Sequence, residues 1–259
     1  MWETRSLLRA IAFDYGDTLG DLRVAEQKLL ETYGDIRRML EAQAQRDIPE
    51  AADLIQNITV RVMSMVGASY ARHELEELDV LALFEEALSA LGLEVPPETV
   101  QQIHELEYRA VVSLRTVPPE NLDALAALRA RGLKLGLVSN AHFLPALMLE
   151  DFERMGLAQY MDAIVTSSQL GVRKPHPAIF ERILDELGVA PEEAVFVGDK
   201  MREDIVGPKE LGMRAVLTHQ FRQEDFDGSP IEPDVVIGSL PELVPYVDRL
   251  LREESQARA

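Results

Sequence analysis

From Pro118 onward, short apolar runs alternate with amphipathic helical patterns. The apolar residues between 179 and 187 have helical spacing, and this pattern ends at Gly188. The runs that predict strands occupy 135–138, 163–166 and 194–197, with weaker candidates at 215–217 and 234–237. This alternation predicts an α/β fold, in which helices wrap an open parallel sheet.

An earlier apolar run, Ala10–Phe13, predicts the first strand of the same sheet. Between about 21 and 114 no run resembles a strand, and apolar residues recur at helical intervals, which predicts four or more helices. The expected architecture is therefore a Rossmann-like core, formed by residues 1–19 and 116–259, with an all-helical domain inserted over 20–115. The last residues, 251–259, lack an apolar period and are expected to fray.

Composition excludes several classes of function. The chain has 259 residues, 47% of them apolar, and no cysteine, which excludes thiol chemistry. Its formal charge of −19, from 45 acidic and 26 basic residues, disfavours nucleic acid and anionic lipid as partners. No signal-peptide segment or run of roughly 20 apolar residues occurs. We expect a cytoplasmic protein, in which a cleft can still bind a small anion through local charges.

Polar residues follow the predicted strands where each one ends. Because parallel strands bring their carboxyl ends to one edge of a sheet, these residues are expected to form one site. They are Asp14, Gly16 and Asp17 after the first strand, Ser139 and Asn140 after the second, Lys174 within Gly171–Pro175, and Asp199 and Asp204 after the run at 194–197. Such a site contains acids, a hydroxyl group and a lysine.

With these four motifs in order, the chain resembles the haloacid dehalogenase (HAD) superfamily, phosphatase branch, with a helical cap inserted after the first motif. The resemblance covers residues 8–19 and 116–220. It implies that Asp14 is a nucleophile, which attacks phosphorus and forms an aspartyl-phosphate that water hydrolyses. It also implies a Mg²⁺ cofactor, since a cation must bring two anions together. The implied metal ligands are Asp14, Asp199, Asp204 and the carbonyl group of Gly16.

The resemblance assigns electrostatic roles to the remaining polar residues. Ser139 would bind a phosphoryl oxygen, helped by backbone N–H groups near Asn140, and Lys174 would neutralise the phosphate and Asp14. Other interpretations stay open. Ser139 could cap the next helix, Lys174 could pair with a surface acid, and Asp204 could reach the metal only through water or instead orient its loop.

One position departs from the family pattern. HAD phosphatases usually carry Asp-x-Asp-x-Thr, in which the second acid protonates the leaving oxygen and then activates water. Here Gly16 occupies that acid's position, and Asp17 follows one residue later. A shift of one residue turns a side chain to the opposite face of an extended segment. Gly16 permits unusual backbone angles, so Asp17 remains a catalytic candidate together with Asp14 and Lys174.

Three hypotheses follow for the function. The first is a Mg²⁺-dependent phosphatase that acts on a small phosphorylated metabolite, with the helical cap selecting the substrate. The second is a 2-haloacid dehalogenase, which also lacks the second acid, although the acids of the fourth motif favour a phosphatase. The third is a degenerate HAD protein that binds a phosphorylated ligand with little turnover. The substrate and the oligomeric state cannot be read from the sequence.

Overall fold

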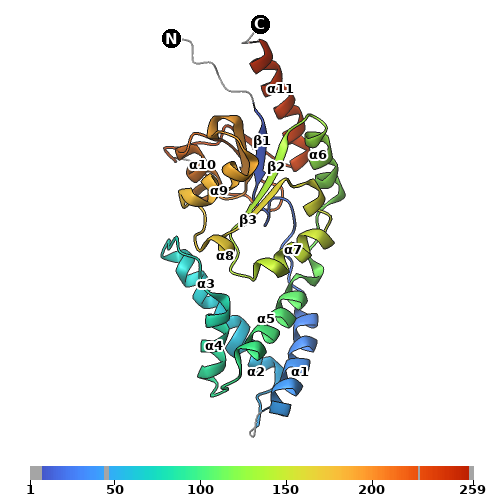
Figure 1. Ribbon diagram of the computed structural model, residues 1–259, viewed down its shortest axis with the longest axis vertical. Coiled ribbons are helices and arrows are strands. Elements are labelled where there is room, and N and C mark those ends of the chain that lie inside the picture. The colour runs from blue at the N-terminus through green and yellow to red at the C-terminus, as the bar shows by residue number, and fades with distance from the viewer. Residues whose placement is uncertain (1–7, 44–46, 227, 257–259) are drawn as a thin grey trace. The chain divides into compact units, whose positions relative to one another are not determined.

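The computed structural model describes residues 8–43, 47–226 and 228–256. The described residues form two compact units. The first contains the chain up to Leu22, Thr116–Ala141 and the residues from Phe152 onward; the second contains Arg23–Arg115 and His142–Asp151. The first unit is α/β and the second is helical, and each is described by itself below (Figure 1).

The α/β unit is built on a parallel sheet, which confirms the predicted fold class. Its six strands have the order β3-β2-β1-β4-β5-β6, and every neighbouring pair is parallel. The strands are β1 (Ala10–Phe13), β2 (Lys134–Ser139), β3 (Ala163–Thr166), β4 (Ala194–Gly198), β5 (Arg214–Thr218) and β6 (Val235–Ile237). All three strong apolar runs and both weak candidates are therefore strands.

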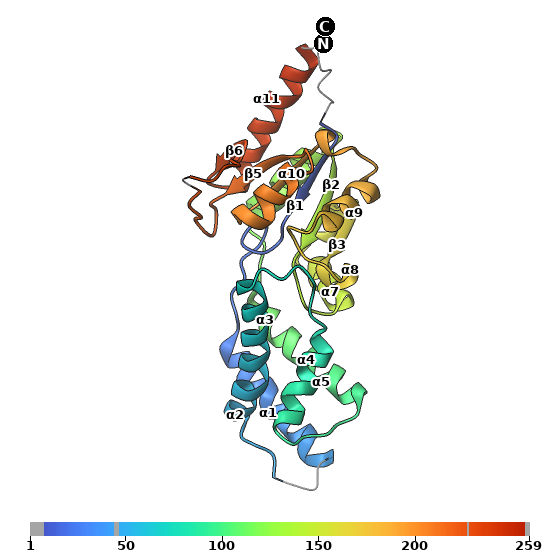
Figure 2. The same cartoon turned by 90° about the vertical axis from the view of Figure 1, so that its left-hand side faces the viewer.

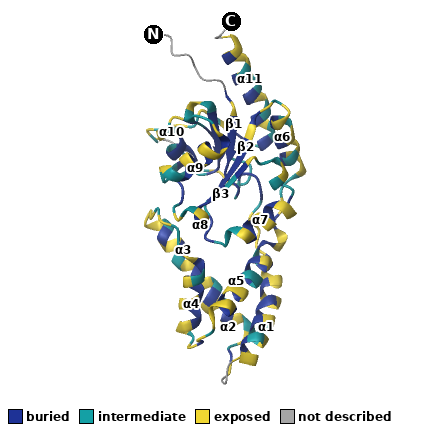
Figure 3. Cartoon of the chain, in the orientation of Figure 1, coloured by how far each residue is buried: buried dark blue, intermediate teal, exposed yellow. Residues whose placement is uncertain are grey.

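The first strand in the chain lies in the middle of this sheet. Phe13, its last residue, pairs with Leu137 on one side and Val197 on the other. The backbone N–H of Asp14 then donates to the carbonyl of Val197 at 2.8 Å. All residues of β1 are buried, as the dark strands in Figure 3 show. Asp14 is thereby fixed beside the carboxyl end of β4.

Helices and short helical turns cover the sheet. Helix α9 presents an apolar face to it, and Gly136 on β2 allows close approach, since a Cβ there would lie 2.9 Å from Ile183. Figure 1 shows α9 and α6 on opposite sides of β1 and β2. The covering elements are α6 (Pro119–Arg129), η3 (Ala158–Tyr160), α8 (Ser167–Leu170), α9 (Pro177–Leu187), η4 (Pro191–Glu193), η5 (Met201–Val206), α10 (Gly207–Glu210), η6 (Leu240–Glu242) and α11 (Leu243–Gln256).

The expectation that residues 251–259 fray was wrong for 251–256, while 257–259 lie outside the described residues. Helix α11 continues to Gln256. Glu254 is buried, and its carboxylate accepts hydrogen bonds from the Leu8 N–H and the Arg214 guanidinium, both at 2.8 Å. The end of α11 is therefore held by polar contacts with residues distant in the chain. Because these contacts are polar, the spacing of apolar residues could not predict them.

The second unit is helical, as predicted for the insertion. Its core consists of buried apolar side chains from helices α1 to α5, which Figure 2 labels. These elements are α1 (Glu26–Gln43), α2 (Ala51–Ile55), η1 (Gln56–Val60), α3 (Arg61–Ala71), α4 (Val80–Ala90), α5 (Pro97–Val111) and η2 (Val112–Leu114); α7 (Pro145–Arg154) begins in this unit and ends in the other. Across the described ranges, no helix is both long and apolar enough to cross a membrane.

Candidate active site

The chain makes a tight turn directly after Asp14. The carbonyl of Tyr15 accepts hydrogen bonds from the N–H groups of Leu19 and Gly20, at 2.9 and 3.2 Å. The left-handed residue of the turn is Asp17, with φ 56°, whereas Gly16 does not adopt a positive φ. The turn therefore does not use the conformational freedom of Gly16. Aspartate tolerates the left-handed region better than most residues, because its side chain is short and polar.

Lys174 forms the centre of the cluster that the strand ends bring together. Its Nζ atom lies 2.7 Å from Asp14 Oδ1 and 2.7 Å from Asp204 Oδ1, and only 2% of the side chain is exposed. Pairing with a surface acid is thus excluded for Lys174. A buried ammonium group between two carboxylates can neutralise negative charge that develops at Asp14.

The side chain of Asn140 holds Lys174 in place through the backbone. Asn140 Oδ1 accepts from the Lys174 N–H at 2.7 Å, and its Nδ2 donates to the Lys174 carbonyl at 3.0 Å. These two bonds join the end of β2 to the loop before α9. The sequence pointed only to backbone groups near Asn140, and the spacing of 34 residues between the partners gave no signal of this contact.

Asp204 lies on η5, a π-helical turn, and packs directly over Gly198 at the end of β4. A Cβ at position 198 would lie 2.3 Å from the Asp204 Cβ, so only glycine fits there. Asp204 Oδ2 accepts from the Lys200 N–H at 3.0 Å while Oδ1 faces Lys174. Asp204 therefore orients its own loop and also belongs to the acid cluster.

Three buried acids have the geometry of a cation site. Oxygen atoms of Asp14, Asp199 and Asp204 lie within 4.8 Å of one another. Asp199 Oδ2 lies 3.3 Å from Arg222 Nη1, a partner that the sequence did not indicate. Asp199 Oδ1 is buried and has no hydrogen-bond partner among the described residues. An orphaned carboxylate oxygen beside two further acids fits a hard divalent cation, which takes oxygen ligands.

The ionisation of the cluster reflects an excess of negative charge. Burial, followed by the charges of Asp14 and Asp204, raises the pKa of Asp199 to about 7. Burial also raises the pKa of Asp14, although Lys174 opposes this shift. For Lys174, burial works against the charged form, but Asp14 and Asp204 together raise the pKa of its ammonium group. Lys174, even with Arg222 beside Asp199, does not balance the three acids, and a bound cation would stabilise their ionised forms.

The other residues singled out in the sequence lie as follows. Ser139 is buried at the end of β2, and it does not cap the next helix, which begins only at Pro145. Asp17 does not belong to the cluster of acids around Asp14. Gly16 forms an isolated β-bridge with Gly20. The structure therefore brings Asp14, Lys174, Asp199 and Asp204 together, and leaves Asp17 outside their group.

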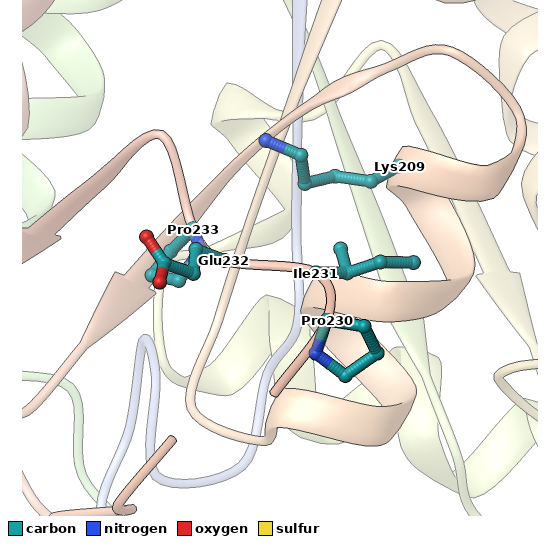
Figure 4. A pocket seen from close by; sticks show the side chains of 5 residues that line it. All are labelled: Lys209, Pro230, Ile231, Glu232 and Pro233. Carbon is teal, nitrogen blue, oxygen red and sulfur yellow. The ribbon is translucent and has the colours of Figure 1, made fainter. Parts of the chain in front are cut away.

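A pocket on the surface of the α/β unit lies apart from these residues in the chain. Figure 4 shows Lys209 on α10 opposite the segment Pro230–Pro233. Lys209 Nζ already pairs with Asp234 Oδ1 at 3.0 Å. None of the residues that line this pocket belongs to one of the four motifs, and the acid cluster is therefore taken as the candidate active site.

Known proteins with similar sequences carry phosphatase names. A glyceraldehyde 3-phosphate phosphatase of Methanocaldococcus jannaschii is 28% identical, over 95% of this chain and 100% of that protein. A phosphoserine phosphatase of Thermus thermophilus is 35% identical, over 70% of this chain and 73% of that protein. Among solved structures, a 2-haloacid dehalogenase of Pseudomonas syringae shares the fold, with a TM-score of 0.66, 24% identity, and coverage of 94% of this chain and 99% of that one.

The α/β unit thus combines a parallel sheet, an aspartate directly after its first strand, and a lysine and two further acids close to that aspartate. The model of the haloacid dehalogenase-like hydrolase family matches residues 8–212. The chain belongs to this family, and the resemblance seen in its motifs is confirmed.

Proposed function

We propose that this chain is a Mg²⁺-dependent phosphatase that hydrolyses a small phosphorylated metabolite through an aspartyl-phosphate on Asp14. The observation that carries the proposal is the buried group of Asp14, Lys174 and two further acids. The names of the similar proteins support a phosphorylated substrate. The helical residues 20–115 are assigned as the cap domain that selects this substrate.

The reaction begins at Asp14. Its carboxylate attacks phosphorus, and the bond between phosphorus and the leaving oxygen breaks. Lys174, 2.7 Å from Asp14 Oδ1, offsets the charge that moves between nucleophile and phosphate. Ser139, with backbone N–H groups near Asn140, binds the phosphoryl oxygens. Water then attacks the phosphorus and releases Asp14 as a carboxylate.

Asp14, Asp199, Asp204 and the Gly16 carbonyl are the residues that would hold Mg²⁺. When bound, this cation lowers the repulsion between the Asp14 carboxylate and the phosphate. The orphaned oxygen of Asp199 supports the assignment. Asp199 is oriented in turn by Arg222, which also pairs with Glu224 at 2.8 Å.

Phosphate release from a panel of phosphorylated metabolites, with Mg²⁺ or with EDTA, tests the proposal. We expect release that requires Mg²⁺ and that the Asp14→Asn variant lacks, because an amide is not a nucleophile at phosphorus. Asp123→Asn, at an exposed position of α6, is the matched control and should retain wild-type rates. Turnover that continues unchanged in Asp14→Asn would refute the assignment of the nucleophile.

A further inference from the structure

Position 16 offers no acid to the reacting phosphate. Position 16 lies two residues after Asp14, in the turn that follows β1. Gly16 has no side chain, and a Cβ there would lie 2.8 Å from Leu22 Cδ1. An apolar side chain therefore covers the space into which a carboxylate at this position would project.

Asp17, the next residue, lies outside the acid cluster and shapes the turn. Its backbone takes the left-handed conformation, with φ 56°, and its N–H donates to the Gly20 carbonyl at 2.9 Å. The acids whose oxygens lie within 4.8 Å of one another include Asp14 and exclude Asp17. Asp17 acts as a turn residue, at a conformation that glycine, asparagine and aspartate tolerate best.

The remaining polar groups around Asp14 in the described α/β unit have other tasks. The Lys174 ammonium is shared between Asp14 and Asp204, both at 2.7 Å, and must keep its charge to hold them. Both oxygens of Asp204 accept hydrogen bonds, from Lys174 and from the Lys200 N–H. Asp199 is assigned to the cation. None of these three side chains is therefore free to protonate a leaving oxygen.

We propose that the enzyme prefers phosphates whose leaving oxygen is stable as an anion, namely phosphorylated carboxylic acids and phenols, over phosphorylated alcohols. This inference rests on the proposed phosphatase function and names the chemistry of its substrate. When Asp14 attacks phosphorus, the electron pair of the broken bond goes to the leaving oxygen. A carboxylate or phenolate departs with that pair alone, whereas an alkoxide needs a proton.

The second half of the reaction is the same for every substrate. Water attacks the aspartyl-phosphate, the electron pair of the phosphorus–oxygen bond returns to Asp14, and the proton from water passes to phosphate or solvent. The identity of the leaving group therefore affects only the first step. The first step determines kcat/KM, so this constant reports the leaving group, while kcat approaches a common value for substrates that react fast.

The test is a series of substituted phenyl phosphates, extended to acetyl phosphate at one end and to alkyl phosphates at the other, assayed with Mg²⁺. We expect log kcat/KM to fall steeply as the pKa of the leaving group rises. Alkyl phosphates should react roughly 10²- to 10⁴-fold more slowly than a site with a general acid would allow. A flat dependence on leaving-group pKa overturns the inference.

A double variant of this chain tests the same inference by restoring an acid at position 16. Gly16→Asp combined with Leu22→Ala restores the acid and clears the space that Leu22 covers. We expect the ratio of alkyl phosphate to acetyl phosphate turnover to rise by about 10² or more, and the slope to become shallower. Leu22→Ala alone is the control and should leave this ratio unchanged, because it adds no acid.

The two proposals fail in different ways. A flat plot with Mg²⁺-dependent turnover removes only the preference for anionic leaving groups and retains the phosphatase. Absence of phosphate release from every compound, acetyl phosphate included, removes the proposed function and the inference that rests on it. Release of halide from a 2-haloacid under the same conditions would likewise remove both the proposed function and the inference.

Discussion

Two glycines near the acid cluster, Gly16 and Gly198, differ in the side chain that a Cβ at their position would meet. Asp204 packs against Gly198 so closely that a Cβ at position 198 would lie 2.3 Å from the Asp204 Cβ. At Gly16, a Cβ would instead lie 2.8 Å from Leu22 Cδ1. Gly198 permits the acid cluster to form, and Gly16 adds no acid to it.

Gly198→Ala should therefore weaken metal binding without replacing any of the proposed ligands. The new methyl group would meet Asp204 Cβ at 2.3 Å, so Asp204 must move away from Lys174 and Asp199. We expect Mg²⁺ affinity, measured by isothermal titration calorimetry, to fall about 10- to 100-fold, as for other losses of support around a ligand.

Gly67→Ala is the matched control for this substitution. Gly67 lies in α3, and no atom lies within 4 Å of the position of its Cβ. Alanine there should raise stability by about 0.5–1 kcal/mol through helix propensity and leave Mg²⁺ affinity unchanged. Equal affinities in wild type and Gly198→Ala would show that Asp204 does not depend on this contact.

At the scale of elements, helix α5 carries a buried acid within the helical unit. Glu107 accepts hydrogen bonds from Tyr33 on α1 and, at 2.9 Å, from the Thr59 hydroxyl on η1. Burial raises the pKa of Glu107 to about 7, although both hydrogen bonds act in the opposite direction. The unit thus tolerates the neutral acid better than the charged one.

The sign of the resulting pH dependence follows from this shift. A folded-state pKa above the unfolded value of 4.5 means that stability is fully present below pH 4.5 and is lost as pH rises through about 7. We expect Glu107→Gln, which removes the ionisation, to lose less stability than wild type over this range. The difference between the two proteins should be on the order of 3 kcal/mol.

Urea unfolding at a series of pH values, followed on the helical signal, measures this difference. Glu105→Gln is the control, since Glu105 is only half-buried on the same helix and pairs with Arg109 at 3.4 Å. The free energy of unfolding of Glu105→Gln should change with pH in the same way as that of wild type. Parallel curves for wild type and Glu107→Gln would contradict the shift at Glu107.

Helix α11 depends on one carboxylate near its end. Glu254→Ala would leave the Leu8 N–H and the Arg214 guanidinium without their acceptor. We expect a loss of about 2–5 kcal/mol in the free energy of unfolding, because a buried charge loses its partner. Glu253→Ala, on the exposed side of the same turn, should change it by less than about 0.5 kcal/mol.

Hydrogen exchange locates the effect of Glu254→Ala. Amide protons in the last turns of α11 should exchange faster in this variant, while those of α9 keep their protection until the whole unit opens. An unfolding free energy equal to that of Glu253→Ala would show that these two hydrogen bonds contribute nothing.

At the scale of the whole molecule, periodicity predicted what depends on local sequence. The run 163–166 is β3 residue for residue, and the insertion is helical throughout its described core. Motif order also predicted that Asp14 and Lys174 come together, because parallel strands align their carboxyl ends. Such features follow from patterns that are repeated within a few residues.

Contacts between distant side chains could not be predicted in this way. Asn140 holds the backbone of Lys174, Arg222 reaches Asp199, and Glu254 binds residues from two other parts of the chain. None of these pairs shares a motif or a period. The left-handed backbone of Asp17 likewise depends on a turn closed by Gly20, which residue type alone does not specify.

The place of β1 in the sheet has a consequence for biosynthesis. The strand that delivers Asp14 leaves the ribosome first, but its two neighbours, β2 and β4, begin only at Lys134 and Ala194. At about 5–20 residues per second, roughly ten seconds or more separate β1 from β4. At the same rate roughly six seconds or more pass before β2 emerges, and until then the helical unit emerges almost complete while β1 has no strand partner. The strand that precedes Asp14 is thus made before both of its neighbours and enters the sheet only when they arrive.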